Sequence, residues 1–126
     1  MNREIEFRAW LKDQKQMVEV NSIMLKSEIV GIEKIDGVYT AKFLEDIELM
    51  QYTGLKDKNS VKIFEGDIVK HVKGNTYKVE FYNGGFKLLR FNVYEGKPVA
   101  YHDFEVRRMD EMEVIGNIYE NPELLR

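Results

Sequence analysis

The sequence predicts an all-β protein of short antiparallel strands and hairpins, with at most one or two short helices. Three observations support this fold class. Short runs in which apolar and polar residues alternate recur along the chain, and this is the period of a half-buried strand. Glycine-containing turns, such as Asp36-Gly37 and Asn83-Gly84-Gly85, separate these runs. Helical spacing is confined to short segments, and the 126 residues, of which 44% are apolar, suffice for a buried core.

The first half of the chain contains two predicted hairpins. Ile5, Phe7 and Ala9 alternate with charged residues, and a polar turn then leads to a return strand at residues 17–20. The runs 29–35 and 38–43 flank Asp36-Gly37, a pair that readily adopts the positive φ angles of a tight hairpin turn.

Four further strands are predicted in the second half, at residues 68–72, 77–82, 86–93 and 114–119. In the third of these, Phe86 and Leu88 share one parity whereas Leu89 and Phe91 share the other, which predicts a β-bulge near Leu88. The alternation also places Tyr77, Phe81 and Phe86 in the core.

Helical spacing occurs in two segments, 43–50 and 106–112, and periodicity does not decide the structure of runs this short. At the C-terminal end, Asn121-Pro122-Glu123 offers an N-cap and a proline at the first helical position, so a single docked turn is expected.

Composition excludes several classes of protein. Without cysteine there are no disulfides, thiolate nucleophiles or cysteine-ligated metals. No apolar run approaches the ~18 residues of a membrane span, and the first ten residues lack the apolar core of a signal peptide. We therefore expect a cytoplasmic globular protein that does not bind membranes.

The residues with catalytic potential form no recognisable constellation. The two histidines, His71 and His102, have no cysteine partner and no serine in a nucleophile motif, so we expect structural or surface roles. Glu65-Gly66-Asp67 has the composition of a turn that opens a strand, although paired carboxylates can also bind Mg²⁺. The sequence therefore predicts no enzyme activity, no metal site and no cofactor.

The formal charge of -3 is unevenly distributed. Residues 1–50 carry seven basic and ten acidic side chains, residues 51–100 carry nine and five, and residues 101–126 carry three and seven. A positive middle segment can attract an anionic partner, although it can equally make contacts within the chain or between copies. The candidate anionic-partner surface consists of Lys70, Lys73, Lys78, Lys87 and Arg90, with Tyr82, Tyr94 and Tyr101 as exposed aromatic platforms.

Three stretches, at residues 3–10, 49–69 and 114–125, closely resemble the YopX family in sequence and order. The middle stretch contains Ile63-Phe64-Glu65-Gly66-Asp67-Ile68-Val69. The resemblance implies a protein encoded by a phage or prophage of Gram-positive bacteria, all-β, with a C-terminal part similar to an SH3-like barrel that begins near Glu65. It implies no activity, cofactor or catalytic residue. Lys58-Asn59-Ser60 departs from the Lys-Asn-Gly of family members, and we expect Asn59 to supply the left-handed conformation of this turn.

These observations predict an N-terminal β-rich segment at residues 1–50 and an SH3-like barrel segment at 51–126, with one continuous domain as the alternative. The expected function is that of a non-enzymatic phage or prophage accessory protein that binds an unidentified phage or host protein and forms homo-oligomers. Val93-Tyr94 and Ile118-Tyr119 are the candidate edges for pairing between copies. The alternative is a nucleic-acid-binding accessory protein that uses the basic surface of residues 67–97.

Overall fold

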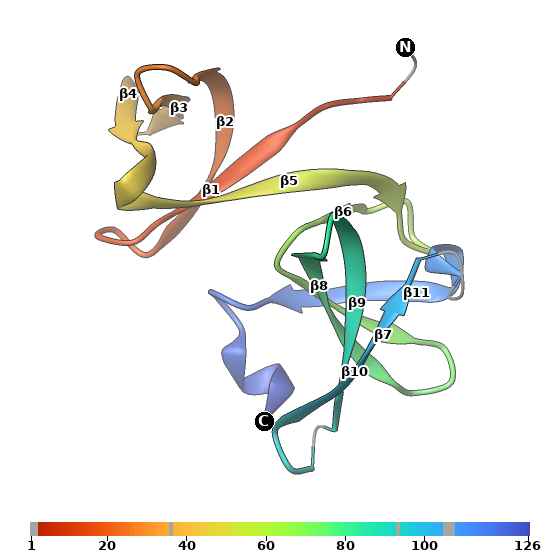
Figure 1. The fold of residues 1–126 in the computed structure, drawn as a ribbon. Coiled ribbons are helices and arrows are strands. Elements are labelled where there is room, and N and C mark those ends of the chain that lie inside the picture. The colour runs from red at the N-terminus through yellow and green to blue at the C-terminus, as the bar shows by residue number, and fades with distance from the viewer. Residues whose placement is uncertain (1–2, 36, 93, 105–107) are drawn as a thin grey trace. The chain divides into compact units, whose positions relative to one another are not determined.

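The computed structural model describes residues 3–35, 37–92, 94–104 and 108–126 (Figure 1). Within these ranges the chain forms eleven β-strands and three 3-10 turns and contains no α-helix, which confirms the all-β prediction. The chain divides into two compact units, Met1–Tyr52 and Thr53–Arg126. In the same ranges, no helix is long and apolar enough to span a bilayer.

The strands in chain order are β1 (Phe7–Leu11), β2 (Gln16–Met24), β3 (Ile29–Ile35), β4 (Val38–Phe43), β5 (Ile47–Lys56), β6 (Lys62–Phe64), β7 (Asp67–His71), β8 (Thr76–Tyr82), β9 (Gly85–Asn92), β10 (Lys97–Asp103) and β11 (Met112–Asn117). The 3-10 turns are η1 (Leu44–Asp46), η2 (Met109–Glu111) and η3 (Pro122–Leu125).

The strands form two sheets. The six-stranded sheet has the order β4-β3-β2-β1-β5-β6, and β5 continues across the boundary between the two units. The five-stranded sheet has the order β10-β9-β8-β7-β11 and lies within the second unit. This sheet has two ends among the described residues, so the closed SH3-like barrel implied by the family resemblance is not confirmed.

A loop occupies the end of the five-stranded sheet at β11. The Lys58 amide donates a hydrogen bond of 2.9 Å to the Met112 carbonyl, and the Val114 amide donates one of 2.9 Å to Asp57 Oδ2. These backbone groups of β11 are therefore not free to pair with another strand. At the opposite end, β10 carries Pro98, which cannot donate to a ladder, and a register shift next to it.

Each unit has its own hydrophobic core. In the first unit, one face of the sheet buries Ala9, Leu11, Val18, Val30, Ile32 and Ile47. In the second, the core cluster contains Ile63, Val69, Tyr77, Val79, Leu88, Met109 and Met112. The inward-facing residues of β8 alternate with outward-facing ones, as a half-buried strand requires.

The predicted bulge near Leu88 is wrong. The register between β8 and β9 runs without interruption from Thr76–Phe91 to Tyr82–Gly85. Leu88 and Leu89 point to opposite faces and are both buried, because the outer face of the sheet is also covered at this position. Coverage of both faces, and not an extra residue, produces the change of parity.

The hairpin predictions depend on turn chemistry. Asn83 and Gly84 both have positive φ angles, 51° and 87°, and join β8 to β9 as predicted. Gly37 has a φ of 84° in the turn between β3 and β4, whereas its predicted partner Asp36 lies outside the described residues. In the turn at 57–60, the left-handed conformation falls on Ser60 (φ 64°), and not on Asn59 as expected.

Three strands did not follow from the sequence pattern: β5, β6 and β10. Ile47, Met50 and Tyr52 of β5 are all buried, but Ile47 lies on the opposite face from the other two, which gives a spacing that resembles a helix. Of the two segments with helical spacing, 43–50 and 106–112, each contributes a single 3-10 turn followed by a strand. The predicted single turn near Pro122 is present as η3.

Candidate functional site

The basic residues of the predicted anionic-partner surface do not share one face of the five-stranded sheet. Side chains of directly paired residues project from the same face. By this criterion Lys70, Lys78 and Lys87 lie on the face opposite to the core cluster, whereas Arg90 pairs with a core tyrosine and lies on the other face. Lys73 lies in the turn between β7 and β8.

Two of these cations are engaged in ion pairs. Lys78 Nζ lies 3.0 Å from Glu80 Oε2, and Lys87 Nζ lies 2.6 Å from Asp103 Oδ1. Lys70 is directly opposite Glu113 of β11. The carboxylates offset much of the positive charge on this face, which weakens its attraction for a polyanion.

The predicted aromatic platforms occupy two places. Tyr82 and Tyr101 stack with ring centroids 4.1 Å apart and an interplanar angle of 1°, and Tyr101 Oη donates a hydrogen bond of 2.9 Å to Glu80. This hydrogen bond raises the pKa of Tyr101. Tyr94 lies in the turn between β9 and β10 and is almost fully exposed. The stack covers one face of each of the two rings, which reduces the aromatic surface open to a base.

Aromatic residues predicted to fill the core extend beyond it. Tyr77 is buried in the core cluster as expected. Phe81 lies on the same face, but near the tip of the β8–β9 hairpin, where it packs edge-on against Phe86 and remains 53% exposed. The alternation in the sequence therefore identified the correct face for Phe81. Its side chain remains exposed because the hairpin extends beyond the core.

Both histidines pack against neighbouring elements. His71 Nε2 lies 3.1 Å from Glu111 Oε1, and its Nδ1 accepts a hydrogen bond from the Lys73 amide. His102 packs edge-on against Tyr77 at 5.9 Å between ring centroids. His71 thus connects the β7–β8 turn to η2.

The buried carboxylates hold turns. Asp57 accepts hydrogen bonds from the amides of Asn59, Val61 and Val114 at 2.8–2.9 Å. Burial acts to raise the pKa of Asp57, but these three hydrogen bonds, together with the charge of Lys58, lower it below its usual value.

Two other buried polar residues in the stretches that resemble the family also stabilise turns. Asp67 Oδ2 accepts a hydrogen bond of 2.7 Å from the Phe64 amide across the turn that contains Gly66. Asn117 Oδ1 accepts hydrogen bonds from the amides of Tyr119 and Glu120. These short-range bonds give the residues an architectural role. No group of three or more His, Asp or Glu able to hold a metal ion occurs among the described residues.

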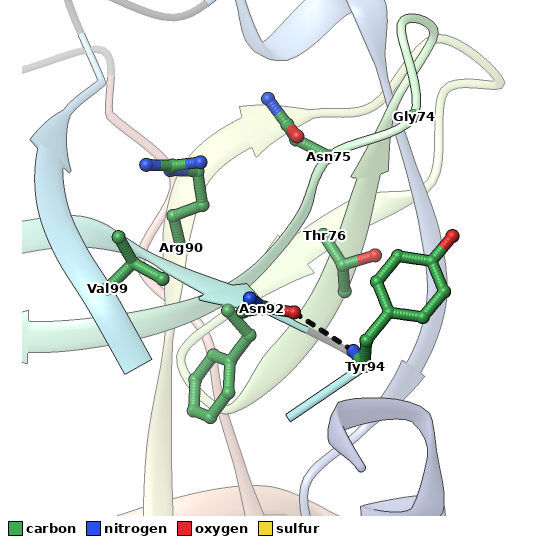
Figure 2. A pocket seen from close by; sticks show the side chains of 8 residues that line it. Gly74, Asn75, Thr76, Arg90, Asn92, Tyr94 and Val99 are labelled. Atoms are coloured by element: carbon green, nitrogen blue, oxygen red, sulfur yellow. Dashed lines mark hydrogen bonds between the residues drawn. The ribbon is translucent and has the colours of Figure 1, made fainter. Parts of the chain in front are cut away.

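A hollow at one end of the five-stranded sheet was not identified from the sequence (Figure 2). We call it the Arg90 hollow; its volume is about 490 Å³, and it is lined by Gly74, Asn75, Thr76, Arg90, Phe91, Asn92, Tyr94 and Val99. Figure 2 shows Arg90 and Tyr94 on opposite sides of the view, with Thr76 and Asn92 between them. The Asn92 side chain accepts a hydrogen bond of 3.1 Å from the Tyr94 amide. No single sequence motif marks this site, because its residues come from three separate segments.

A second surface missed by the sequence reasoning lies in the first unit. We call it the Phe43 face; it comprises Met24, Ile29, Tyr39, Ala41 and Phe43 on the side of β2–β4 opposite to the core. Ile29 pairs directly with Met24 on one side and with Phe43 on the other, so the three side chains form a row across the sheet. Met24 and Phe43 are each more than half exposed. β4 is the edge strand of its sheet.

The residues predicted to form exposed strand edges, Val93-Tyr94 and Ile118-Tyr119, do not lie in described strands. Tyr94 belongs to a turn, Val93 lies outside the described residues, and β11 ends at Asn117, before Ile118 and Tyr119. The Ile118 amide donates a hydrogen bond to the Gly66 carbonyl, which directs the chain away from the sheet edge. The prediction of strand edges is therefore wrong for Tyr94, Ile118 and Tyr119.

Comparisons with known proteins give a family and a fold. The model of the YopX protein family matches residues 6–126, and no curated protein sequence matches the chain. The crystal structure of protein EF1440 from Enterococcus faecalis is 28% identical, with a TM-score of 0.65 over 99% of this chain and 100% of that one. The structure of protein yopX from Bacillus subtilis is 20% identical, with a TM-score of 0.58 over 96% of this chain and 95% of that one. Neither name specifies a biochemical activity.

Proposed function

The chain belongs to the YopX family, and on this premise we propose that it is a non-enzymatic interaction module that self-associates through the Phe43 face. We also propose that the protein is encoded by a phage or prophage and acts as an accessory protein in the bacterial cytoplasm. The observation that carries it is the row of exposed apolar side chains on an edge of the six-stranded sheet.

The Phe43 face is costly to leave in water. Phe43 is 56% exposed and Tyr39 is 69% exposed, and both belong to the edge strand β4. Burial of apolar surface is favourable by roughly 25 cal/mol per Å². An edge strand also presents backbone groups that can pair with another strand. Exposed apolar surface on an edge strand is typical of an interface.

A second copy of the chain fits this edge. With a two-fold axis at Ala41, antiparallel pairing would place Tyr39 opposite Phe43 of the other copy, twice. The same register places Lys42 opposite Thr40, so no like charges face each other. Aromatic cross-strand pairs contribute about 0.2–1 kcal/mol each beyond pairs of alanine. The strand is thus complementary to itself.

The ionisable groups support a role other than catalysis. Asp57 and Asp67 are occupied by backbone amides, and His71 bridges Glu111 and the Lys73 amide. These groups stabilise the fold in their present positions. The ion pairs of Lys78 and Lys87 likewise favour protein contacts over binding of a long polyanion.

Light scattering coupled to size-exclusion chromatography tests the proposal. We expect a dimer or larger assembly at about 100 μM protein, with the same mass in low and high salt because apolar contacts are not screened. Phe43→Lys should weaken association by about tenfold or more, which corresponds to at least ~1.4 kcal/mol.

Val72→Lys is the matched control. Val72 is an exposed apolar residue of the second unit, so its replacement changes the charge equally and should leave the mass unchanged. A monomeric parent, or a Phe43→Lys variant that associates like the parent, would contradict self-association through this face. Far-UV circular dichroism establishes that both variants are folded.

A further inference from the structure

We propose that the Arg90 hollow binds a nucleotide unit, with the phosphate held by Arg90 and the base placed against Tyr94. The proposal is independent of self-association, because the hollow lies in the second unit and the Phe43 face in the first. It rests on the uncommitted polar groups of the hollow, on its charge and on its one exposed ring.

The Arg90 guanidinium is the charged group of the hollow. Within the described part of the chain it has no carboxylate partner, in contrast to Arg108, whose guanidinium contacts Asp110 at 2.8 Å. The lining contains no acidic residue. A guanidinium without a counterion presents a rigid fork of N–H donors that matches the oxygens of a phosphate. The charge of the hollow therefore selects an anion.

Thr76 supplies a second polar group. The residue is only 7% exposed, yet it lines the hollow, and its hydroxyl has no hydrogen-bond partner among the described residues. In Figure 2 this hydroxyl points towards the Tyr94 ring. The hydroxyl oxygen is not among the buried atoms that lack a hydrogen-bond partner, so solvent reaches it, and a ligand in the hollow can replace that solvent. Asn75 lines the same space.

The side chain of Tyr94 indicates a ligand with a flat ring. The residue is 98% exposed, although it lines the hollow, and its backbone amide donates a hydrogen bond to Asn92. Nucleobases stack on such rings irrespective of their identity. Glu95, the next residue, is held by the Asn92 amide at 3.3 Å and is not part of the lining.

The size of the hollow is compatible with this ligand. A volume of about 490 Å³ falls within the range of roughly 300–1,000 Å³ found for small-molecule sites. The hollow is open to solvent, so the nucleotide unit can be free or can belong to a single strand. Both sources present the same phosphate and base.

The experiment is a titration of the full chain with AMP, adenosine, inorganic phosphate and a short oligothymidylate, followed by backbone amide chemical shifts. We expect AMP or the oligonucleotide to shift the amides of Thr76, Asn92 and Tyr94 with a dissociation constant of about 1 mM or tighter. Adenosine and phosphate alone should bind more weakly. Saturation by AMP identifies a free nucleotide as the ligand, and binding of the oligonucleotide alone identifies a single strand.

Variants separate the two halves of the site. Arg90→Gln should weaken the binding of AMP or the oligonucleotide by about tenfold or more, and Arg90→Lys should weaken it less, because the charge remains without the fork. Tyr94→Ala, at an exposed turn position, should weaken nucleotide binding but not phosphate binding. Arg108→Gln is the matched control and should have no effect. Absence of shifts with both AMP and the oligonucleotide, or unchanged affinity in Arg90→Gln, would overturn the proposal.

Discussion

Asp57 holds the 57–61 loop against β11, and its removal should destabilise the protein strongly. The carboxylate is 5% exposed and accepts three backbone hydrogen bonds, from Asn59, Val61 and Val114. In Asp57→Ala all three amides lose their acceptor. The Val114 amide belongs to β11, whereas the other two lie in the loop and can regain water in part. With a penalty of ~1–3 kcal/mol for each unsatisfied buried group, we expect a total loss of about 3–5 kcal/mol.

Asp57→Asn should cost less than Asp57→Ala. The amide oxygen can still accept the bonds from Asn59 and Val61, but the NH₂ group replaces the acceptor of the Val114 amide. We expect a loss of about 2 kcal/mol from this one position. For a chain of this length, 1 kcal/mol corresponds to roughly 3–6 °C in melting temperature, so the two variants should be clearly separated.

The carboxylate of Asp57 also makes stability depend on pH. Its folded-state pKa lies below the ordinary value of 3.8, so the unfolded chain binds more protons in acid. Stability from this group is complete above the unfolded pKa and is lost as the pH falls through the folded pKa. Asp57→Asn should therefore lose less stability than the parent on acidification from about pH 5 to pH 2.

Thermal denaturation followed by circular dichroism measures these effects. Asp110→Asn is the control, since Asp110 is an exposed carboxylate with its own partner, Arg108. This variant should melt within about 2 °C of the parent. If Asp57→Ala also melts within that interval at pH 7, or if Asp57→Asn is less stable than Asp57→Ala, the assignment of Asp57 as the anchor of the loop is wrong.

Three further substitutions test the turns by the same melting assay. Ser60→Gly should stabilise the protein by about 0.5–1 kcal/mol. Ser60 has a φ of 64°, which costs a non-glycine residue ~1–2 kcal/mol, and the greater entropy of unfolded glycine offsets part of this gain. A destabilised variant would refute this reasoning. Gly66→Val should destabilise by roughly 1–3 kcal/mol, because Gly66 has a φ of 88°, and a melting curve that matches the parent would remove the argument. Asn117→Ala should destabilise by about 2–4 kcal/mol, since its buried side chain accepts two backbone bonds; a loss below about 0.5 kcal/mol would contradict this role.

The predictable part of the fold is the part that depends on local chemistry. Apolar runs and turn residues located β3, β4, β7, β8 and β9, because each is a short run of alternating or β-branched residues next to a turn that the sequence identifies. The sequence pattern did not predict β5, because its buried residues lie on different faces along the strand. The bulge near Leu88 was inferred wrongly for a related reason, since burial on both faces imitates a shift of register.

The candidate sites were less accessible to sequence reasoning. Basic residues that are close in sequence were grouped into one surface, but strand pairing sends Arg90 to one face and Lys87 to the other. The Arg90 hollow combines a turn after β7, the end of β9 and the start of β10, whose proximity depends on long-range pairing. The Phe43 face joins Met24 to Phe43 through Ile29, and this row exists only once three strands are in register.

The continuity of β5 restricts how this chain can change in length. Its first part pairs with β1 from Ile47 to Gln51, and further along Thr53 Oγ1 donates a hydrogen bond of 2.7 Å to the Ile63 carbonyl. One residue inserted between these positions would exchange the faces of every side chain that follows within the strand. Loops such as that at 73–75 absorb insertions locally. Within this family, we expect insertions and deletions to be tolerated in the hairpin loops and to be selected against in β5, so that exchange of one unit between relatives succeeds only when the spacing inside this strand is kept.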